Sequence, residues 1–431
     1  DVIVVGLGPG GEDVAGRLAE AGLGVIGVEQ QLVGGECPYW GCVPSKMMIR
    51  AADSLAEGRR VAQLAGSAEV HPDWAPVARR IREEATDNWD DAVAVERLEG
   101  KGGRFVRGRA RIVGPRAVEV DGQRYDAARG LVIATGASPT LPPVDGLAAT
   151  PYWTNRHAIE TEQVPASLTV IGGGAVGLEL AQVFARFGAQ VTVLEVADRL
   201  LGVEEPEAGD LLADVLTREG LRVVTGARIA RVDHDGHGFA TQLDGGEVLR
   251  SERLLVATGR RPDLAALGVG AAGLDESARS IPVDGHLRAA DGVWAVGDVT
   301  GAGAFTHVAT YQARIAAADI LGEPHEPASY HALPRVTFTD PEVGAVGMTE
   351  AQARDAGIPV ATATTQIPAS ARGWIHKAGN DGFIKLVADT AQGVLVGATS
   401  AGPAGGEVLG ALAVAVHARV PVRTLGEMIY A

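Results

Sequence analysis

The 431-residue sequence is poor in cysteine, in aromatic residues and in basic side chains. Its two cysteines are too few to hold a fold of this size together through disulfide bonds. Aromatic residues make up 4% of the chain, so a surface of rings for stacking nucleic-acid bases is not indicated. Lysine and arginine total 38 against 54 acidic residues, which gives a net charge of −16. This balance argues against nucleic acid or an anionic membrane surface as the partner, because both require clustered cations.

No run of apolar residues reaches the ~18 that a membrane-spanning helix needs, and we expect no signal peptide, because Asp1–Val5 already has the pattern of a strand. We therefore expect a cytoplasmic enzyme. Hydrophobic residues at 46% and charged residues at 21% are typical of a globular fold, and the length favours roughly three domains. Glycine is abundant, at 58 residues, which indicates many tight turns and close approaches of the backbone.

One βαβ pattern occurs twice in the sequence. In each copy an apolar strand leads into a glycine-rich turn, an amphipathic helix and a second strand that ends in glutamate. The first copy comprises the strand Asp1–Val5, the turn glycines Gly6, Gly8 and Gly11, the helix Glu12–Ala21, and the strand Gly24–Val28 before Glu29. The second comprises the strand Ser167–Ile171, the turn glycines Gly172, Gly174 and Gly177, the helix Leu178–Phe187, and the strand Gln190–Leu194 before Glu195. The glutamate follows the third glycine by 18 residues in both copies.

This pattern is the fingerprint of a dinucleotide-binding site. The glycines let backbone N–H groups at the start of the helix approach a pyrophosphate, whose charge the helix dipole favours. The glutamate at the end of the second strand accepts hydrogen bonds from a ribose. Turns without a ligand are the alternative, and the repeated context argues against them. The sequence therefore predicts an α/β protein with two dinucleotide sites.

Further strands support the duplication. Leu131–Gly136 is similar to Leu254–Gly259, and a third apolar run, Gly292–Val296, precedes Gly297 and Asp298. These positions favour a second nucleotide unit inserted into the first, with boundaries near residues 142–146, 280 and 324–327. Between the two copies, residues 66–99 are predicted to be helical and solvated, because Arg79/Glu83 and Arg80/Glu84 are spaced by four residues.

Both cysteines lie in one short stretch, as Cys37-x4-Cys42, at the predicted start of a helix. A zinc site would need two more ligands at matching spacing, and the nearest histidine is His71, so we predict no metal here. Two inert buried thiols are another alternative. A redox pair is favoured, because the two residues are close enough to bridge and a helix N-terminus promotes the reactive thiolate.

The stretch Gly34–Lys46, with its Cys37-x4-Cys42-Val-Pro-Ser-Lys run, is similar to the active-site signature of the class I flavoprotein disulfide reductases. That family includes dihydrolipoamide dehydrogenase, glutathione reductase and mercuric reductase. The resemblance covers essentially the whole chain, including Thr135-Gly136, Gly297-Asp298 and Phe338–Val343. It implies two Rossmann-like domains and a C-terminal α+β dimerisation domain, hence a homodimer. The implied limits are 1–146 with 280–325 for FAD, 147–279 for the nicotinamide dinucleotide and 328–431 for dimerisation.

The resemblance also assigns roles to residues. Cys37 would be the thiol that attacks the substrate, and Cys42 the thiolate next to the flavin. Lys46 and Glu179 would form an ion pair near the flavin, although Glu179 could also be a plain carboxylate at a helix start. His307 is more readily a structural residue than an acid/base group. The implied FAD-binding residues are Gly6, Gly8, Gly11, Glu29, Gly35, Lys46, Ala110, Thr135, Gly136, Asp298, Thr306 and His307. Those for the nicotinamide dinucleotide are Gly172, Gly174, Gly177, Glu195 and Gly259.

The sequence departs from the family pattern at several points. Pro38, Tyr39 and Trp40 lie between the cysteines, where small or aliphatic residues are usual, and Glu36 replaces a threonine that normally touches the FAD phosphates. We expect Glu36 to turn away or to bind through water. The extra cysteine pair and the N-terminal metal-binding module of mercuric reductases are missing, so we expect a different activity. The family's C-terminal acid/base histidine is not found up to Ala431, and His417 is expected to be an exposed helix residue.

Glu195 favours NAD(H) over NADP(H), because a carboxylate repels a 2′-phosphate; the neighbouring Arg199 works against this slightly. The predicted activity is transfer of electrons from NADH through FAD to the Cys37–Cys42 pair and on to a small-molecule disulfide, or the reverse oxidation of a dithiol such as dihydrolipoamide. One alternative is an NADH-dependent quinone or metal-ion reductase. Another is a non-catalytic FAD-binding redox sensor. The sequence does not name the substrate.

Overall fold

The computed structural model describes residues 1–430. Contacts within the chain divide it into two compact units. The first unit comprises Asp1–Pro44, Arg79–Thr140 and Arg260–Ser329, and the second comprises Ser45–Ala78, Leu141–Gly259 and the chain from Tyr330 onward. This division reflects only which residues contact one another, and the limits given above for the FAD, nicotinamide and dimerisation domains stay a prediction. Within residues 1–430, no helix combines the length and the apolar character needed to cross a membrane.

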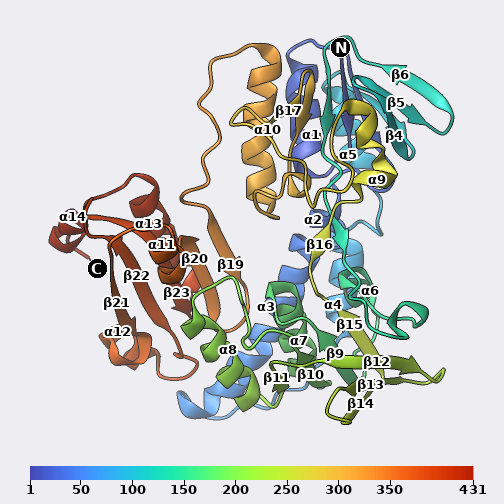
Figure 1. Ribbon diagram of the computed structural model, residues 1–431. Helices are drawn as coiled ribbons and strands as arrows, with labels where there is room; N and C mark the ends of the chain where they lie inside the picture. Colours follow the sequence, from blue (N-terminus) through green and yellow to red (C-terminus); the bar gives the residue numbers. More distant parts are fainter. Residues whose placement is uncertain (431) are drawn as a thin grey trace. The chain divides into compact units, whose positions relative to one another are not determined.

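The first unit is built on a six-stranded sheet with the order β17-β18-β7-β1-β2-β3 (Figure 1). All neighbouring strands are parallel except β17 and β18. The strands are β1 (Val2–Val5), β2 (Val25–Glu29), β3 (Arg104–Arg107), β7 (Gly130–Ile133), β17 (Arg288–Ala290) and β18 (Val293–Ala295). Every residue of β1 and β7 is buried, as expected of parallel strands that are covered on both faces.

Alternate residues of β1 face two different cores. Val2 and Val4 pack with residues of α1 (Pro9–Glu20) and α10 (Thr306–Leu321) on one face of the sheet. Ile3 and Val5 pack on the other face. That face is covered by the antiparallel strands β4 (Ala110–Gly114), β5 (Ala117–Val120) and β6 (Gln123–Asp126), and by α9 (Leu264–Leu267). Two short strands, β8 (Ser138–Pro139) and β16 (Arg260–Arg261), form an antiparallel pair.

The helix predicted over residues 66–99 is interrupted. The helical pieces are α4 (Ala75–Arg80), a π-helical turn (Ile81–Ala85) and α5 (Ala92–Gly100). Between them Asp87, Asn88 and Trp89 adopt left-handed backbone angles, with φ of 47°, 58° and 57°, which end the helix. The Asp91 carboxylate then accepts hydrogen bonds from the Val33 backbone and from Arg107. The predicted Arg80–Glu84 ion pair is present at 3.0 Å.

The second unit contains the second βαβ pattern, in a parallel sheet with the order β11-β10-β9-β15. Its strands are β9 (Ser167–Ile171), β10 (Gln190–Leu194), β11 (Arg222–Val224) and β15 (Arg253–Val256), and its helices are α6 (Asn155–Glu160), α7 (Ala175–Arg186) and α8 (Pro206–Arg218). An antiparallel sheet of β12 (Ile229–His234), β13 (Phe239–Leu243) and β14 (Val248–Ser251) follows. The long helix α3 spans Cys42–Arg60, and its part from Ser45 on belongs to this unit.

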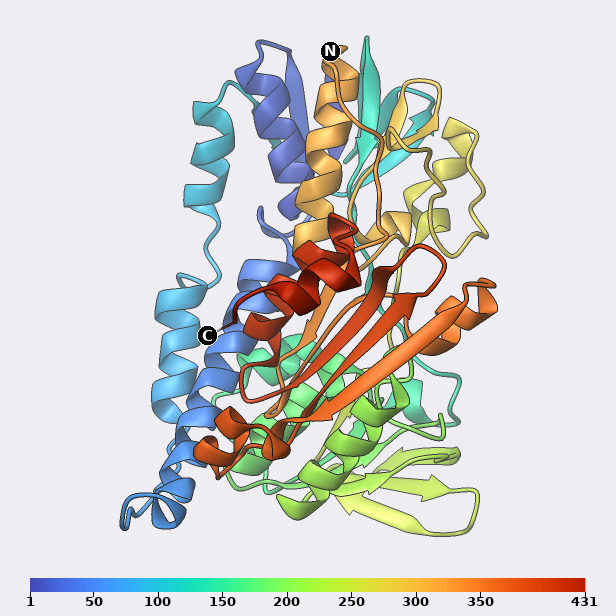
Figure 2. The same cartoon turned by 90° about the vertical axis from the view of Figure 1, so that its left-hand side faces the viewer.

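The C-terminal part of the second unit is a five-stranded antiparallel sheet with the order β19-β20-β23-β22-β21 (Figure 2). The strands are β19 (Pro334–Thr337), β20 (Glu342–Gly347), β21 (Val360–Gln366), β22 (Phe383–Asp389) and β23 (Val394–Gly402). Helix α13 (Gly405–His417) packs on β20 and β23, with Leu409 and Val416 against Val346 and Leu395. The remaining helices are α2 (Glu36–Tyr39) in the first unit, and α11 (Glu350–Asp355), α12 (Ala371–His376) and α14 (Val422–Glu427) in the second.

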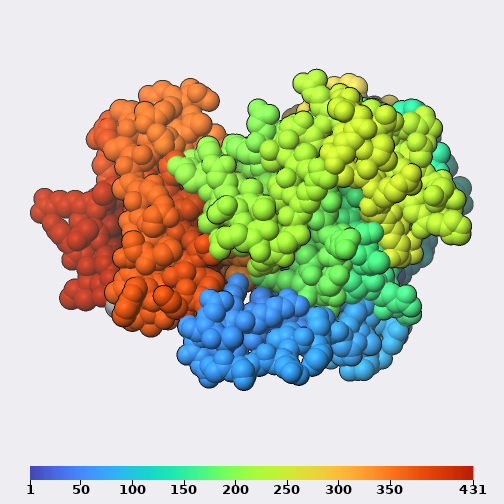
Figure 3. Space-filling view, turned by 90° about the horizontal axis from the view of Figure 1, so that it is seen from below, coloured from blue at the N-terminus to red at the C-terminus, as the bar shows by residue number. Residues whose placement is uncertain are grey.

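Ion pairs of the buried Lys385 side chain join three segments of the second unit, and Figure 3 shows the surfaces of these segments together. Lys385 of β22 binds Glu205, Glu207 and Glu350 at 3.0, 2.7 and 3.1 Å. These contacts connect the nucleotide-type sheet with the C-terminal sheet. The predicted fold class, two Rossmann-like sheets followed by a C-terminal α+β part, is confirmed.

Candidate functional site

The first glycine turn, between β1 and α1, is shaped for close backbone contact. Gly6 has φ of 88°, and a Cβ there would lie 2.5 Å from the carbonyl oxygen of Ala134. A Cβ on Gly11 would lie 1.9 Å from the carbonyl oxygen of Gly6, so no larger residue fits between helix and strand. Gly8, in contrast, would meet no protein atom within 4 Å. The turn is therefore packed at its two ends and open at its middle glycine, as a cradle for a pyrophosphate requires.

The second turn, between β9 and α7, repeats this arrangement. A Cβ on Gly172 would lie 2.4 Å from the carbonyl oxygen of Ala257, and one on Gly177 would lie 2.1 Å from the carbonyl oxygen of Gly172. Gly174 is again open, with nothing within 4 Å. Neither α1 nor α7 has a side-chain cap at its N-terminus, so both helix starts present backbone N–H groups in the manner of anion-binding turns.

Glu29 and Glu195 are held alike. In the first unit, the Leu7 backbone N–H donates to Glu29 Oε2 at 2.9 Å, and the Gln31 N–H donates to Oε1 at 2.7 Å. In the second, the Gly173 N–H donates to Glu195 Oε2 at 2.6 Å, and the Ala197 N–H donates to Oε1 at 2.8 Å. Each carboxylate is thus fixed at the end of its strand, beside the glycine turn of its own unit.

The cysteines lie at the starts of two helices in the first unit. Cys37 is the second residue of α2, and Cys42 begins α3. Both are free thiols; Cys37 is half-buried and Cys42 is exposed. The hydrogen bond between the two side chains raises the pKa of Cys37, burial raises it further, and Thr306 lowers it. The Cys37 thiol therefore holds its proton more firmly than a free cysteine does.

Thr306 connects the cysteines with the start of α10. Its Oγ1 lies 3.4 Å from Cys42 Sγ, and α10 begins at Thr306. The positive end of the α10 dipole therefore lies next to the sulfur and favours a thiolate. The neighbouring His307 is exposed and stacks on Phe305, with ring centroids 5.2 Å apart.

The loop between the cysteines is closely packed. Tyr39 and Trp40 are buried, and their ring centroids are 5.8 Å apart. The Tyr39 hydroxyl donates to the carbonyl oxygen of Asp90 at 3.4 Å. Gly35 has φ of 68°, and a Cβ there would lie 2.8 Å from Cα of Gly8. The cysteine loop therefore rests directly on the first glycine turn.

Arg260 is a site residue that the sequence reasoning missed. Its guanidinium lies 3.7 Å from the Glu36 carboxylate and donates to the carbonyl oxygen of Ala137. Burial raises the pKa of Asp298, whereas Arg260 lowers it and Glu36 raises it. The residue thus supplies positive charge to two carboxylates of the first unit. Its place directly after Gly259, at the end of the repeated strand pattern, is the signal that could have found it.

In the second unit, Lys46 and Glu179 form the predicted ion pair. Lys46 Nζ lies 2.8 Å from Glu179 Oε2. The other carboxylate oxygen accepts the Phe338 backbone N–H at 2.8 Å, and the ammonium lies 4.6 Å from the centroid of the Phe338 ring. Glu179 is 5% exposed. The carboxylate is therefore more than a helix-start residue, because it binds two partners from distant parts of the chain.

The remaining predicted positions lie at strand ends. Ala110 is buried and begins β4. Thr135 and Gly136 follow β7, and Gly136 has φ of 66°. Gly259 follows β15 with φ of 111° and open space at its Cβ position. His417 is exposed at the end of α13, as expected.

Comparison with known proteins agrees with this geometry. Residues 1–313 match the family model described as pyridine nucleotide-disulphide oxidoreductase, and residues 333–431 match its dimerisation domain. The chain belongs to the pyridine nucleotide-disulphide oxidoreductase family. The sequence resemblance to flavoprotein disulfide reductases is thereby confirmed, and membership of this family implies FAD and a pyridine nucleotide as cofactors.

Individual relatives differ in their activities. A mercuric reductase from Bacillus cereus is 33% identical over 434 residues, covering 99% of this chain and 68% of the relative. A dihydrolipoyl dehydrogenase from Thermus scotoductus is 34% identical over 447 residues, covering 100% of this chain and 94% of the relative. Among solved structures, the Cu(II) complex of the HOCl-induced flavoprotein disulfide reductase RclA from Escherichia coli superposes with a TM-score of 0.88 at 27% identity, covering 100% of this chain and 96% of that one.

Proposed function

We propose that this protein is an FAD-dependent, NADH-using disulfide oxidoreductase whose Cys37–Cys42 pair exchanges electrons with a small external disulfide or, in reverse, with a dithiol. The observation that carries the proposal is the thiol pair itself. The two side chains are hydrogen-bonded to each other, and Cys42 lies 3.4 Å from Thr306 at the positive end of α10. An inert pair of cysteines has no need of a helix start and a neighbouring hydroxyl.

The first glycine turn fits FAD. Gly8 leaves space where the pyrophosphate would lie, Glu29 is fixed for a ribose, and Asp298 would hold the ribityl side. When bound, FAD supplies two-electron transfer between a nicotinamide and a disulfide. Arg260 offsets the negative charge of Glu36, which explains how a carboxylate can stand where the family usually has threonine.

The cysteines carry the sulfur chemistry. Cys37 passes its proton to the Cys42 thiolate and attacks one sulfur of the substrate, a new S–S bond forms, and the second substrate sulfur leaves with that proton. The Cys42 thiolate then attacks the sulfur of Cys37, forms the Cys37–Cys42 disulfide and releases the second substrate thiol. Two electrons from NADH restore the dithiol. Because the pKa of Cys37 is raised while Cys42 shares its hydrogen bond, Cys42 is the sulfur suited to rest as a thiolate.

The second glycine turn fits NADH better than NADPH. Both oxygens of Glu195 are held by backbone N–H groups, so the carboxylate stays beside the ribose and repels a 2′-phosphate. Arg199, the cation nearest in sequence, donates to the carbonyl oxygens of Gly202 and Glu204. Comparing kcat/KM for the two coenzymes tests this; a higher value for NADPH would contradict it.

An anaerobic titration with NADH tests the main proposal. We expect a long-wavelength absorbance band from the Cys42 thiolate beside oxidised flavin, and reduction of at least one compound in a panel of lipoamide, glutathione disulfide and other low-molecular-weight disulfides. Bleaching without the band, together with no disulfide reduction, would favour the redox-sensor alternative. The C-terminal match to a dimerisation domain supports a homodimer, which light scattering after gel filtration would test.

Reduction of a quinone or a metal ion directly by the flavin, with the cysteine pair secondary, is the second candidate. It is supported by the mercuric reductases among the relatives and by the Cu(II) complex of the structural neighbour. The Cys42→Ser variant separates the candidates. Disulfide reduction requires both sulfurs and should vanish, whereas reduction of a quinone or a metal ion directly by the flavin should survive.

A further inference from the structure

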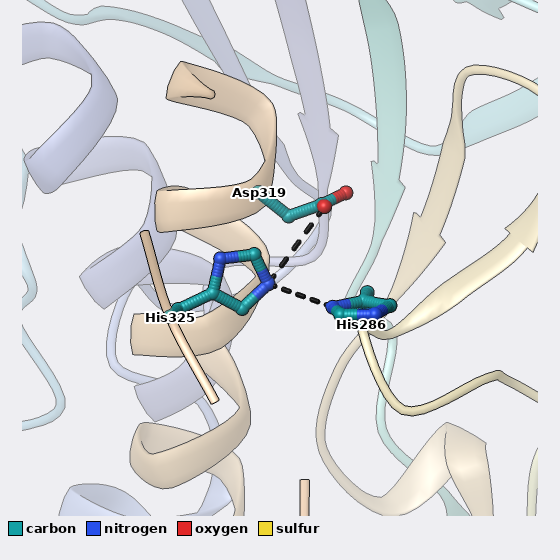
Figure 4. Close-up of side chains that lie close together, drawn as sticks. All are labelled: His286, Asp319 and His325. Atoms are coloured by element: carbon teal, nitrogen blue, oxygen red, sulfur yellow. Dashed lines mark hydrogen bonds and ion pairs between the residues drawn. The ribbon is translucent and has the colours of Figure 1, made fainter. Parts of the chain in front are cut away.

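A second group of metal-binding side chains lies in the first unit, at the far end of α10. His286 precedes β17, Asp319 lies in the last turn of α10, and His325 follows that helix. His286 Nδ1 and His325 Nε2 are 2.9 Å apart, and His325 Nε2 is 3.7 Å from Asp319 Oδ1 (Figure 4). Within residues 1–430, this is the one group of three or more His, Cys, Asp or Glu residues whose ligand atoms converge, all within 4.8 Å.

Hydrogen bonds outside the group fix which atoms face inward. His325 Nδ1 lies 2.9 Å from the carbonyl oxygen of Glu323. A carbonyl only accepts, so Nδ1 carries the proton and Nε2 presents its lone pair to His286 and Asp319. Metal-binding histidines are held in the same way, by a donor bond from the ring nitrogen that does not touch the metal.

The Asp319 carboxylate is also held in a fixed orientation by hydrogen bonds. Trp294 Nε1 and Arg288 Nε donate to Asp319 Oδ2 at 2.8 and 2.7 Å, and a second Arg288 nitrogen donates to Oδ1 at 2.6 Å. Burial works to raise the pKa of Asp319, but the bonds from Arg288 and Trp294 outweigh it and the pKa is lowered. The Asp319 side chain is 4% exposed and that of His325 is 14% exposed, so both are held in place and screened from bulk water.

We propose that His286, Asp319 and His325 bind one divalent transition-metal ion of the Zn²⁺ type, with water completing the coordination. Two atoms that each lie ~2.05 Å from a common ion are about 2.9 Å apart at a right angle and about 3.3 Å apart at a tetrahedral angle. The separation of 2.9 Å between the two imidazole nitrogens falls at the lower end of this range. The ion would replace the proton that the two imidazoles share.

The charge of the site points to a class of metal. Arg288 neutralises Asp319, so the attraction depends on the two imidazoles rather than on negative charge. Imidazole suits Zn²⁺ and Cu²⁺, whereas Mg²⁺ and Ca²⁺ prefer oxygen ligands. Asp319 follows Thr306 by thirteen residues along α10, which is roughly 20 Å at the usual rise. The ion would therefore tie the end of α10 to the turn before β17, apart from the thiols.

The test uses the FAD-loaded full chain with Cys37→Ser and Cys42→Ser, so that the thiols offer no competing ligand. Calorimetric titration with ZnSO4 should give one Zn²⁺ per chain, and MgCl2 should give no binding. His286→Ala or His325→Ala should weaken Zn²⁺ binding at least tenfold. His331→Ala is the matched control, because His331 belongs to another histidine pair, stacked on His417 with ring centroids 5.5 Å apart; it should bind Zn²⁺ like the parent.

A second measurement does not depend on whether the histidine variants fold. In the same parent, the paramagnetic resonance spectrum of one added equivalent of Cu²⁺ should show hyperfine splitting from two nitrogens. Absence of stoichiometric Zn²⁺ binding, equal binding by the His325→Ala variant, or a Cu²⁺ spectrum without nitrogen splitting would overturn the proposal. The three residues would then form a hydrogen-bonded network only. None of these outcomes bears on disulfide reduction by the unmodified protein.

Discussion

Lys46 and Glu179 lie 2.8 Å apart, and the same carboxylate also accepts the backbone N–H of Phe338. Glu179→Gln keeps the shape of the side chain but leaves the Lys46 ammonium without its counter-charge. We expect the rate of flavin reduction by NADH to fall roughly 100- to 1,000-fold, the size of effect seen when one preorganised electrostatic contact is lost. Stopped-flow absorbance measures this rate. Unchanged flavin content would show that the site is still formed, and an unchanged rate would remove the pair from the mechanism.

The hydrogen bond between the cysteines determines how the reactivity of Cys37 should depend on pH. Because the pKa of Cys37 is raised, chiefly by Cys42, little Cys37 thiolate exists near neutral pH, and alkylation by iodoacetamide should be slow and still rising above pH ~9, beyond the usual thiol value of ~8.5. Cys42→Ala removes the largest cause and should move the midpoint of the rate profile to lower pH. Peptide mapping by mass spectrometry follows the reaction at Cys37. Identical profiles in the two proteins would contradict the coupling.

Glu29 and Glu195 make equivalent hydrogen bonds in two separate sites, which allows a crossed experiment. Glu29→Ala should lower the FAD content of the purified protein and leave the KM for NADH of the loaded fraction unchanged. Glu195→Ala should keep FAD but lower kcat/KM for NADH by about tenfold, a loss of about 1.4 kcal/mol, with a smaller loss for NADPH. Flavin absorbance and steady-state rates supply both readouts. Loss of FAD from the Glu195 variant would mean that the sites are assigned wrongly.

Arg186 is expected to matter for stability. Its side chain is 3% exposed and binds Asp53, Glu219 and Asp340 at 2.6–2.7 Å. Arg186→Met would remove the buried cation from three partly exposed carboxylates, of which Asp340 also binds Arg60 and Glu219 also accepts from Gln182. We expect a cost toward the lower end of about 3–5 kcal/mol, visible as a lower Tm. The control is Arg231→Met. Arg231 also binds two carboxylates, Asp145 and Asp233, but it is 48% exposed, so its replacement should leave the Tm unchanged.

Asp53 gives the stability a pH dependence. Burial raises its pKa from 3.8 to about 6, against the opposing effect of Arg186. A carboxyl that holds its proton more tightly in the folded state favours folding at low pH, and this contribution is lost as the pH rises from about 4 through about 6. Relative to the unchanged protein, Asp53→Asn should therefore gain Tm between pH 4.5 and 7.5. A constant difference in Tm across this range would show that Asp53 does not titrate there.

The local pattern of apolar and polar residues explains which strands and helices the sequence predicts correctly. The strands Ser167–Ile171 and Gln190–Leu194 are predicted with the bounds that the structure has, because apolar runs between glycine and polar residues mark them clearly. The helices α1 and α7 begin three residues earlier than predicted, at Pro9 and Ala175. Their first turns consist largely of glycine and small residues, which carry no helical periodicity.

The rest of the site depends on contacts that sequence spacing does not encode. Phe338 donates to a carboxylate 159 residues away, and Arg260 reaches Glu36 from a distant segment of the sequence. The family signature supplied Lys46 and Glu179, but nothing in the sequence indicated their third partner. The break at Asp87–Trp89 had only a weak signal, since none of these residues is glycine, although Asp and Asn adopt left-handed angles more readily than other residues.

The contact between Gly35 and Gly8 has a consequence for how this protein can change. Gly35 leaves no room for even one methyl group between the loop that carries the sulfurs and the turn proposed for the pyrophosphate, because a Cβ there would lie 2.8 Å from Cα of Gly8. Any side chain at residue 35 would clash with the first glycine turn and push the cysteine loop, with its two thiols, away from it. The position of the two thiols and the shape of the glycine turn are therefore coupled, and a substitution that alters one would alter the other.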